Sequence, residues 1–497
     1  MRRRIKLYIL IMSVTLLGPS LSWAEYDVID ITKPFLRKIP LAVPLFKNAV
    51  GSGEEEQSSQ EAAEFLSDSL DFTGYFKLLD RGAFLFDPET NGVTETDLNF
   101  QNWTVVGAEL LVTGYYRLTG DDITIELRLF DTFKAQRVLG KKYTGKVANQ
   151  RDIILRFCTE VIKYLTGGEG IFGSEIAFVS NGTGNKEIYI SAFDGYNPRR
   201  LTTNNAITLF PAWSSDGKWL AFTSYKAGNP DLYIRDLAKA QESKVSKQGI
   251  NITPAWAPGK FELAATLSFS GDQEIYLLTG SGKIIKRLTK SRGIDVTPTW
   301  SPDGKKIAFV SNRSGNAQIY IKDLATGRVN RLTYEGQKNT QPSWSPRGDK
   351  IAYTSQIDGE HHIFTIGTDG QNPVQLTYES RDNESPSWSP DGKRLLFVSS
   401  RDGMRDLYLI DRAGRGVRLT HALEAVMATG YHPMCEAIGI EAVRLVMGSL
   451  KRAVSDGHDV QARADMALAA AMGAVAFQKG LGAAHSLAHP LSTLANV

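Results

Sequence analysis

A polar side chain stands three residues before each of five Pro-x-Trp sequences in this chain. The five residues are Thr208, Asn251, Asp295, Asn339 and Asn383. Their hydroxyl, amide and carboxylate groups donate or accept hydrogen bonds. Such groups either cap their own backbone in a loop or bind a partner. Both roles can hold at once, because a capped loop is rigid and a rigid loop loses less entropy on binding. The five are therefore candidate partner-binding residues.

These polar residues belong to a longer repeat. The tryptophans of the five copies lie 43 or 44 residues apart, at Trp213, Trp256, Trp300, Trp344 and Trp388. A fixed period of this size is typical of repeat folds. Each copy has a turn such as Ser-Pro-Asp-Gly and then an alternating strand such as Ile307 to Ser311, which we expect to be half-buried. An Ile-Tyr strand and a strand ending in Arg-Leu-Thr follow. The pattern predicts one propeller blade per repeat.

The Ile-Tyr and Arg-Leu-Thr strands occur once more, in residues 174–202, without a Pro-x-Trp strand of their own. The sequence therefore predicts an all-β, six-bladed propeller over residues 169–420, with an incomplete first blade. Each repeat has two or three Gly, Pro or Asp turns and no apolar run at helical spacing, which excludes a helical solenoid. Equivalent positions of a propeller form a ring on one face, so the five polar residues should encircle the channel mouth.

Residues 25–168 have a different pattern, which predicts a small α/β domain. The run LAVPLF indicates a buried strand, and QEAAEFLSDSLDFTGYFKLL has helical spacing. Two alternating stretches joined by Gly-Asp-Asp predict a hairpin. An amphipathic helix ending at glycine closes the domain. Cys158 lies in this helix, and we expect it to be a buried apolar thiol.

The first 24 residues predict a signal peptide. Arginines and a lysine precede an apolar run that is too short to span a bilayer, and small residues mark a cleavage site before Glu25. We therefore expect an exported mature chain without a transmembrane segment. The net charge of +3 over 497 residues gives no reason to expect nucleic acid as a partner. Cys158 and Cys435 are the only cysteines and imply no disulfide framework.

No catalytic or cofactor motif occurs in residues 25–420. The stretch contains no phosphate-binding loop, no His-Glu-x-x-His pair and no Gly-x-Ser-x-Gly turn. His361 and His362 stand where sister repeats have other residues, and we interpret them as surface variation and not as a metal site. We expect no cofactor and no enzymatic activity from this part of the chain.

The order of signal peptide, small domain with W-x-x-x-GAELLVTGYY, and blades with P-x-W-S-P-D-G-K resembles the TolB family of Tol-Pal systems over residues 1–420. The resemblance implies a periplasmic, non-enzymatic hub in outer-membrane invagination during division. It implies that the propeller binds the lipoprotein Pal and that the mature N-terminus binds TolA, with other envelope proteins as further partners. The corresponding arm is Glu25, Tyr26, Asp27, Val28, Ile29 and Asp30, which could otherwise be a frayed end.

Residues 421–497 break the pattern with an Ala-rich helical composition. HALEAVMATGYHPMCEAIGIEAVRLV and FQKGLGAAHSLAHPLS resemble a fragment of the iron-dependent alcohol dehydrogenases. The resemblance makes His421 and His485 vestigial matches to metal ligands, but Val417 stands where an aspartate is required, so we expect no bound metal. The tail is an accidental fusion, a cover for the open edge of the propeller, or the source of an alternative dehydrogenase-like activity.

Overall fold

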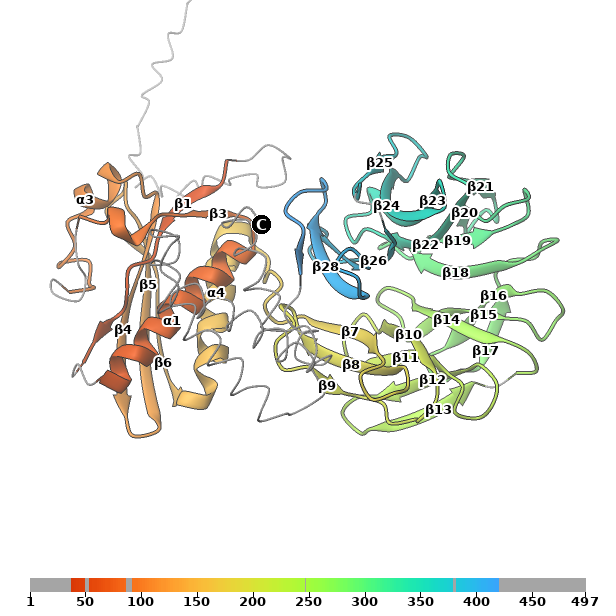
Figure 1. The fold of residues 1–497 in the computed structure, drawn as a ribbon, viewed down its shortest axis with the longest axis horizontal. Coiled ribbons are helices and arrows are strands. Elements are labelled where there is room, and N and C mark those ends of the chain that lie inside the picture. Colours follow the sequence, from red (N-terminus) through yellow and green to blue (C-terminus); the bar gives the residue numbers. More distant parts are fainter. Residues whose placement is uncertain (1–36, 50–52, 86–91, 246, 379–380, 420–497) are drawn as a thin grey trace, which may run out of the picture. The chain divides into compact units, whose positions relative to one another are not determined.

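The structure is a computed structural model that describes residues 37–49, 53–85, 92–245, 247–378 and 381–419. These residues belong to two compact units that divide between Gly168 and Glu169 (Figure 1). The predicted signal peptide, the arm Glu25 to Asp30 and the tail 421–497, with His421 and His485, lie outside the described residues.

The first unit is a mixed sheet with helices. Its elements are β1 (Ile39–Ala42), β2 (Lys47–Asn48), α1 (Gly53–Phe72), β3 (Phe76–Leu78), a 3-10 turn (Arg81–Ala83), α3 (Phe100–Val105), β4 (Leu110–Thr119), β5 (Asp122–Asp131), β6 (Gln136–Lys146), a second 3-10 turn (Val147–Asn149) and α4 (Gln150–Thr166). The strands are ordered β3-β1-β4-β5-β6, and β2 also pairs with β4. β1 runs parallel to β3 and β4, whereas β4, β5 and β6 are antiparallel.

Helices α1 and α4 pack against each other and bury apolar side chains such as Leu66 and Phe157. α4 ends at Gly167, whose φ of 75° is the left-handed conformation that glycine adopts most readily. The predicted α/β class and the hairpin of β4 and β5 are confirmed. Strand β6 was not predicted, because its side chains are mostly exposed and polar and give no alternating apolar pattern.

The second unit is the predicted six-bladed propeller (Figure 1). Blade one has three strands, β7 (Glu175–Ser180), β8 (Glu187–Ala192) and β9 (Arg199–Arg200). The other blades have four: β10 (Thr208–Trp213), β11 (Trp219–Ser224), β12 (Asp231–Asp236) and β13 (Gln241–Val245); β14 (Asn251–Trp256), β15 (Glu262–Leu267), β16 (Glu274–Thr279) and β17 (Ile284–Arg287); β18 (Asp295–Trp300), β19 (Lys306–Ser311), β20 (Gln318–Asp323) and β21 (Val329–Arg331); β22 (Lys338–Trp344), β23 (Lys350–Ile357), β24 (Glu360–Gly367) and β25 (Val374–Gln375); β26 (Asn383–Trp388), β27 (Arg394–Ser399), β28 (Asp406–Asp411) and β29 (Arg418–Leu419).

The Pro-x-Trp strands β10, β14, β18, β22 and β26 are the innermost strands, since each contacts the next from blade to blade. The second strand of a blade was expected to be half-buried, and this is wrong for β11, β15, β19 and β23, whereas β27 alternates between buried and partly exposed residues. β19 is buried from Ile307 to Ser311. Both of its faces are covered because blades stack face to face, so apolar and polar side chains alike are removed from water.

The recurring motifs hold each blade together. In every blade except blade three, the aromatic residue after the Ile or Leu of the third strand packs against an aromatic residue of the second strand. Tyr320, for example, stacks on Phe309 with ring centroids 6.1 Å apart. The Thr of Arg-Leu-Thr accepts a hydrogen bond from the backbone N–H of the Ile, as Thr289 does from Ile275 at 2.9 Å. These contacts join the second, third and fourth strands.

The tryptophans link neighbouring blades. The indole N–H donates to the carbonyl one residue before the preceding Trp, at 3.0–3.1 Å, in Trp256 to Ala212, Trp300 to Ala255 and Trp388 to Ser343. The 44-residue period of the sequence thus corresponds to a hydrogen bond across a blade boundary.

Candidate functional site

The five predicted polar residues lie at the start of an innermost strand: four are its first residue, and Asn339 is the second residue of β22. Each lies opposite a residue at or near the end of the second strand, as Asn339 lies opposite Ser355. All five are 0–1% exposed: Thr208, Asn251, Asp295, Asn339 and Asn383. The structure therefore places them at equivalent positions, but with their side chains inside the blades.

Their hydrogen bonds go to nearby loops and strands. The Asn339 amide Nδ2 donates to Gln318 Oε1 at 2.8 Å and to the Glu335 carbonyl at 2.6 Å. Asp295 accepts two hydrogen bonds from the Arg313 guanidinium, at 2.8 and 2.9 Å. These contacts fix the loops that enter each innermost strand, as expected of capping residues.

Each innermost strand is strained two residues further on. Phe210, Thr253, Thr297, Gln341 and Ser385 have φ between 49° and 56°, where non-glycine residues are uncommon. The register with the second strand shifts at the same place in all five blades. Each bulge directly precedes the proline of Pro-x-Trp, and such bulges re-aim the side chains next to them.

The innermost strands begin on the face that carries two sets of loops, those from the second to the third strand and those from the fourth strand to the next blade. We call this the loop face. Large apolar side chains are 37–72% exposed in these loops: Ile207, Tyr225, Phe269, Ile294, Tyr334 and Tyr378. Such a concentration on one face of a soluble domain is typical of a binding surface.

Two of these aromatic residues are held at equivalent positions, directly after the Leu-Thr of their blades. The Tyr334 ring lies under the Arg331 guanidinium, 4.7 Å from its carbon to the ring centroid. The Tyr378 hydroxyl donates to the Gln375 carbonyl at 2.9 Å. Sequence reasoning missed these residues. The signal was present in the sequence LTYE, where an aromatic residue follows the strand instead of a polar loop residue.

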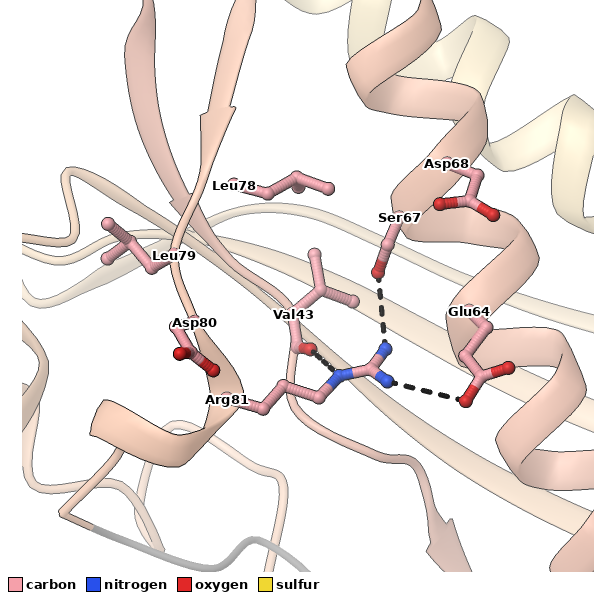
Figure 2. A pocket seen from close by; sticks show the side chains of 8 residues that line it. All are labelled: Val43, Glu64, Ser67, Asp68, Leu78, Leu79, Asp80 and Arg81. Atoms are coloured by element: carbon pink, nitrogen blue, oxygen red, sulfur yellow. Dashed lines mark hydrogen bonds and ion pairs between the residues drawn. The ribbon is translucent and has the colours of Figure 1, made fainter. Parts of the chain in front are cut away.

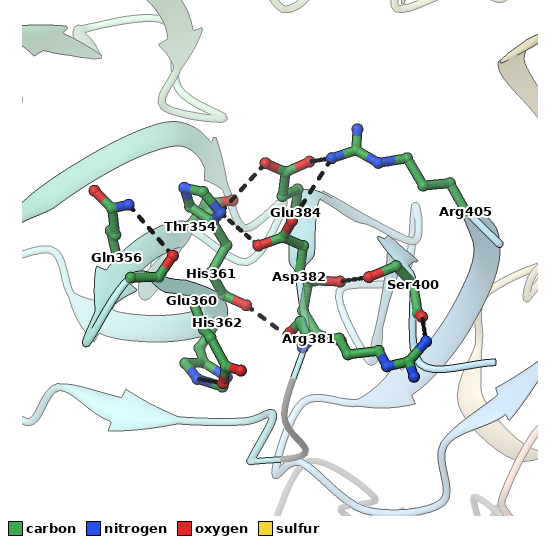
Figure 3. A network of polar contacts seen from close by, with 12 residues as sticks. Thr354, Gln356, Glu360, His361, His362, Arg381, Asp382, Glu384, Ser400 and Arg405 are labelled. Atoms are coloured by element: carbon green, nitrogen blue, oxygen red, sulfur yellow. Dashed lines mark hydrogen bonds and ion pairs between the residues drawn. The ribbon is translucent and has the colours of Figure 1, made fainter. Parts of the chain in front are cut away.

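Charged groups gather on the loop face between blades five and six, as Figure 3 shows. His361 Nδ1 lies 2.7 Å from Asp382 Oδ1. Arg405 Nη2 lies 2.9 Å from Glu384 Oε2. The hydrogen bond with His361 holds the pKa of the Asp382 carboxyl below its usual value. This cluster joins the two blades electrostatically.

The interpretation of both histidines as surface variation is wrong for His362. Its side chain is buried, and it takes the position that Glu274 and Gln318 occupy in blades three and four. Its Nδ1 atom has no hydrogen-bond partner within the described part of the chain. Among the described residues, no group of three or more His, Cys, Asp or Glu side chains is arranged to hold a metal ion.

Figure 2 shows a hollow in the first unit around Arg81. The guanidinium donates from Nε to the Val43 carbonyl at 2.9 Å and from Nη2 to Ser67 Oγ at 3.3 Å, and it lies 3.8 Å from Glu64. Because Arg81 is directed at α1 and at the chain after β1, we assign it a structural role.

Cys158 is fully buried, as expected, and burial raises the pKa of its thiol.

Models of known families match three parts of the chain. The TolB amino-terminal domain matches residues 27–138, and the TolB beta propeller domain matches residues 162–427. The C-terminal part of the Fe-containing alcohol dehydrogenase family matches residues 417–497, which confirms the resemblance of the tail.

Curated relatives and solved structures agree with the first two matches. The Tol-Pal system protein TolB of Desulfosudis oleivorans is 53% identical over 58% of this chain and 66% of its own length. The TolB homolog of Chlorobaculum tepidum is 44% identical over 50% of this chain and 56% of its own length. The chain thus matches about half to two thirds of these relatives. The crystal structure of TolB from Acinetobacter baumannii has a TM-score of 0.66 and 26% identity, covering 77% of this chain and 93% of that one. No helix among the described residues is long and apolar enough to cross a membrane.

Proposed function

The chain belongs to the TolB family, and from this premise we propose that it is a periplasmic, non-enzymatic protein-binding hub of the Tol-Pal system. In this proposal the propeller binds Pal and the mature N-terminus binds TolA, and the complex acts in outer-membrane invagination and envelope integrity. The relatives named as Tol-Pal proteins support the system, and the shape and surface of the propeller support a protein partner.

The observation that carries the proposal is the row of exposed apolar side chains on the loop face. Tyr334 and Tyr378 are 71% and 72% exposed, yet each is held by a contact to its own blade. Aromatic side chains held in place lose little entropy on binding and often dominate interfaces. The buried polar residues Asn339 and Asn383 contribute by fixing the loops beneath them, and we propose this indirect role for all five.

Titration of the mature chain, residues 25–497, with the soluble part of Pal tests the proposal. We expect saturable binding that weakens about tenfold or more when Tyr334 and Tyr378 are both changed to Ala. Ile285→Ala is the matched control, because Ile285 is an exposed apolar residue on an outer strand and not on the loop face. The proposal would be contradicted if the double variant and Ile285→Ala bound Pal equally well. It would also be contradicted if the parent chain did not bind Pal.

The arm Glu25 to Asp30 is proposed as the TolA site, where an extended segment could add a strand to its partner. A chain that begins at residue 31 should lose binding to the soluble part of TolA and keep binding to Pal. If the shortened chain still bound both TolA and Pal, TolA binding would belong to another surface.

A metal-dependent dehydrogenase activity does not fit the described residues. Val417 stands where that family requires an aspartate ligand, and it packs against the apolar core of blade six together with Trp388. A valine side chain has no atom that can bind a metal ion. We therefore derive no reaction through the tail.

A further inference from the structure

Blade one lacks the innermost strand that the five other blades have. Among the described residues, β7 pairs with β8 on one side and with no strand on the other. A strand edge of this kind presents unpaired backbone N–H and C=O groups, which another extended chain can pair with.

The apolar side chains around this edge are less buried than their counterparts. In β11 the residues from Leu220 to Ser224 are all buried, whereas Ile176, Ala177 and Val179 of β7 are partly exposed. On the facing side of blade six, Leu396 and Leu409 are also partly exposed. Ile176 and Leu396 belong to one apolar cluster, so blades six and one meet in the absence of the strand.

Two further groups beside blade two are open. Within the described part of the chain the buried Trp213 indole N–H has no acceptor, although Trp256 and Trp300 find theirs in the innermost strand of the preceding blade. The Trp344 N–H also has none there, although its preceding blade is complete. A Cβ atom on Gly348 would lie 3.3 Å from Pro302 of the preceding blade, whereas one on Gly217 would meet nothing within 4 Å. Gly259 is equally open, because the preceding blade has Ser215 in place of this proline.

We propose that the inner edge of β7 is an acceptor site for an extended segment of another polypeptide, with the pattern polar-x-x-Pro-x-Trp-Ser-Pro. The register follows from the complete blades two, three, four and six, in which the polar residue faces the last residue of the second strand and the Trp faces its second residue. In blade five the Trp pairs in the same way, and the second strand extends two residues beyond the partner of Asn339. The incoming polar residue lies opposite Ser180 and the incoming Trp opposite Ile176.

The same register assigns partners to the groups that are now open. The incoming indole N–H donates to the Ser387 carbonyl, as the Trp388 N–H donates to Ser343. The carbonyl before the incoming Trp accepts from Trp213, and the second proline covers Gly217. Backbone pairing supplies affinity, and the tryptophan between Leu396, Leu409 and Ile176 supplies specificity.

The Pro-x-Trp segments within residues 1–497 already have places in the propeller. There are five, and all five are innermost strands of their own blades. Residues 421–497 contain no tryptophan. A partner that fits this site therefore presents an unpaired Pro-x-Trp strand.

A synthetic peptide with the sequence of Arg381 to Gly392, RDNESPSWSPDG, is a suitable probe, because it contains one innermost strand and its turn. Calorimetric titration into the full mature chain should give saturable one-to-one binding. The same peptide with Ala in place of Trp388 should bind at least tenfold more weakly. Hydrogen exchange should slow at backbone amides of β7 when the parent peptide is bound.

A chain variant sharpens the test. Leu396 stands where four blades have Ala221, Ala264, Ala308 or Ala352, so Leu396→Ala should enlarge the tryptophan pocket and tighten peptide binding. The proposal is overturned if neither the parent chain nor Leu396→Ala binds the peptide. It is also overturned if binding leaves the exchange of β7 unchanged.

Discussion

The indole N–H of Trp256 donates to the backbone carbonyl of Ala212 at 3.1 Å, across the boundary between blades two and three. Trp256 is also buried in an apolar cluster formed by both blades, which includes Ala221 and Leu263. One side chain thus combines a hydrogen bond and apolar packing at the interface of two repeats.

Replacing Trp256 by Phe should lower the free energy of unfolding by about 1–2 kcal/mol, because a buried carbonyl loses its donor and the core loses volume. Trp213→Phe is the matched control, since the Trp213 N–H has no acceptor. Trp213→Phe should lower the free energy of unfolding by about 1 kcal/mol less than Trp256→Phe does. Urea denaturation of both variants gives the comparison, and equal losses would mean that the bond between blades contributes nothing.

Glu274 is fully buried and holds the third and fourth strands of blade three together. It accepts hydrogen bonds from Arg287 at 2.7 Å, from the Thr289 hydroxyl at 2.6 Å and from the Ser291 N–H at 2.8 Å. Glu274→Ala should lower the free energy of unfolding by about 3 kcal/mol, because it leaves buried donors and a positive charge without their acceptor.

Glu274→Gln should cost less than Glu274→Ala. Gln318 occupies the equivalent position in blade four and accepts from the Thr333 hydroxyl at 2.8 Å. Glu335→Ala, at an exposed carboxylate, serves as the surface control. If the Gln variant were as unstable as the Ala variant, the charge and not the hydrogen bonds would be the main contribution.

The sequence predicted the repeat better than it predicted the site. The period placed Asn251 and Asn339 at equivalent positions correctly, because strand and turn lengths are local properties. It did not reveal that their side chains are buried, since hydrogen-bonding capacity does not specify the partner. The burial of His362 was missed for the same reason. In blades three and four the equivalent residues, Glu274 and Gln318, accept a hydrogen bond from the Thr that follows the fourth strand, and only the paired strands of the folded blade show this.

The thiol of Cys158 should be unreactive in the folded chain. It is fully buried in α4, and burial raises its pKa, so little of the nucleophilic thiolate forms near neutral pH. In a Cys435→Ser variant, Cys158 is the only cysteine. A disulfide reagent at pH 8 should leave it unmodified in buffer and modify it fully in denaturant. Fast labelling in buffer would show that the first unit opens readily or packs differently.

The stability of the junction between blades five and six should depend on pH through Asp382. The hydrogen bond with His361 lowers the pKa of Asp382 in the folded chain. Below about pH 5 the Asp382 carboxyl therefore binds a proton more readily in the unfolded chain than in the folded chain. The stabilisation of the folded chain by this carboxyl, which is present above that pH, is lost as the pH falls through the lowered pKa. Two further charged groups face this pair. Arg405 lies 3.9 Å from Asp382, and Glu384 lies 3.6 Å from His361.

Asp382→Asn should therefore lower the melting temperature by about 1–2 °C at pH 6–7, because the Asp382 side chain is 41% exposed and solvent screening limits such a pair to about 0.5 kcal/mol. The difference from the parent chain should shrink as the pH falls through the lowered pKa of Asp382, because the carboxyl of the parent then becomes protonated in the folded state as well. Thermal melts across this pH range measure the difference, with Asp272→Asn, at an exposed carboxylate, as the control. A difference that stayed constant from pH 3 to pH 7 would mean that Asp382 acts through packing and not through its charge.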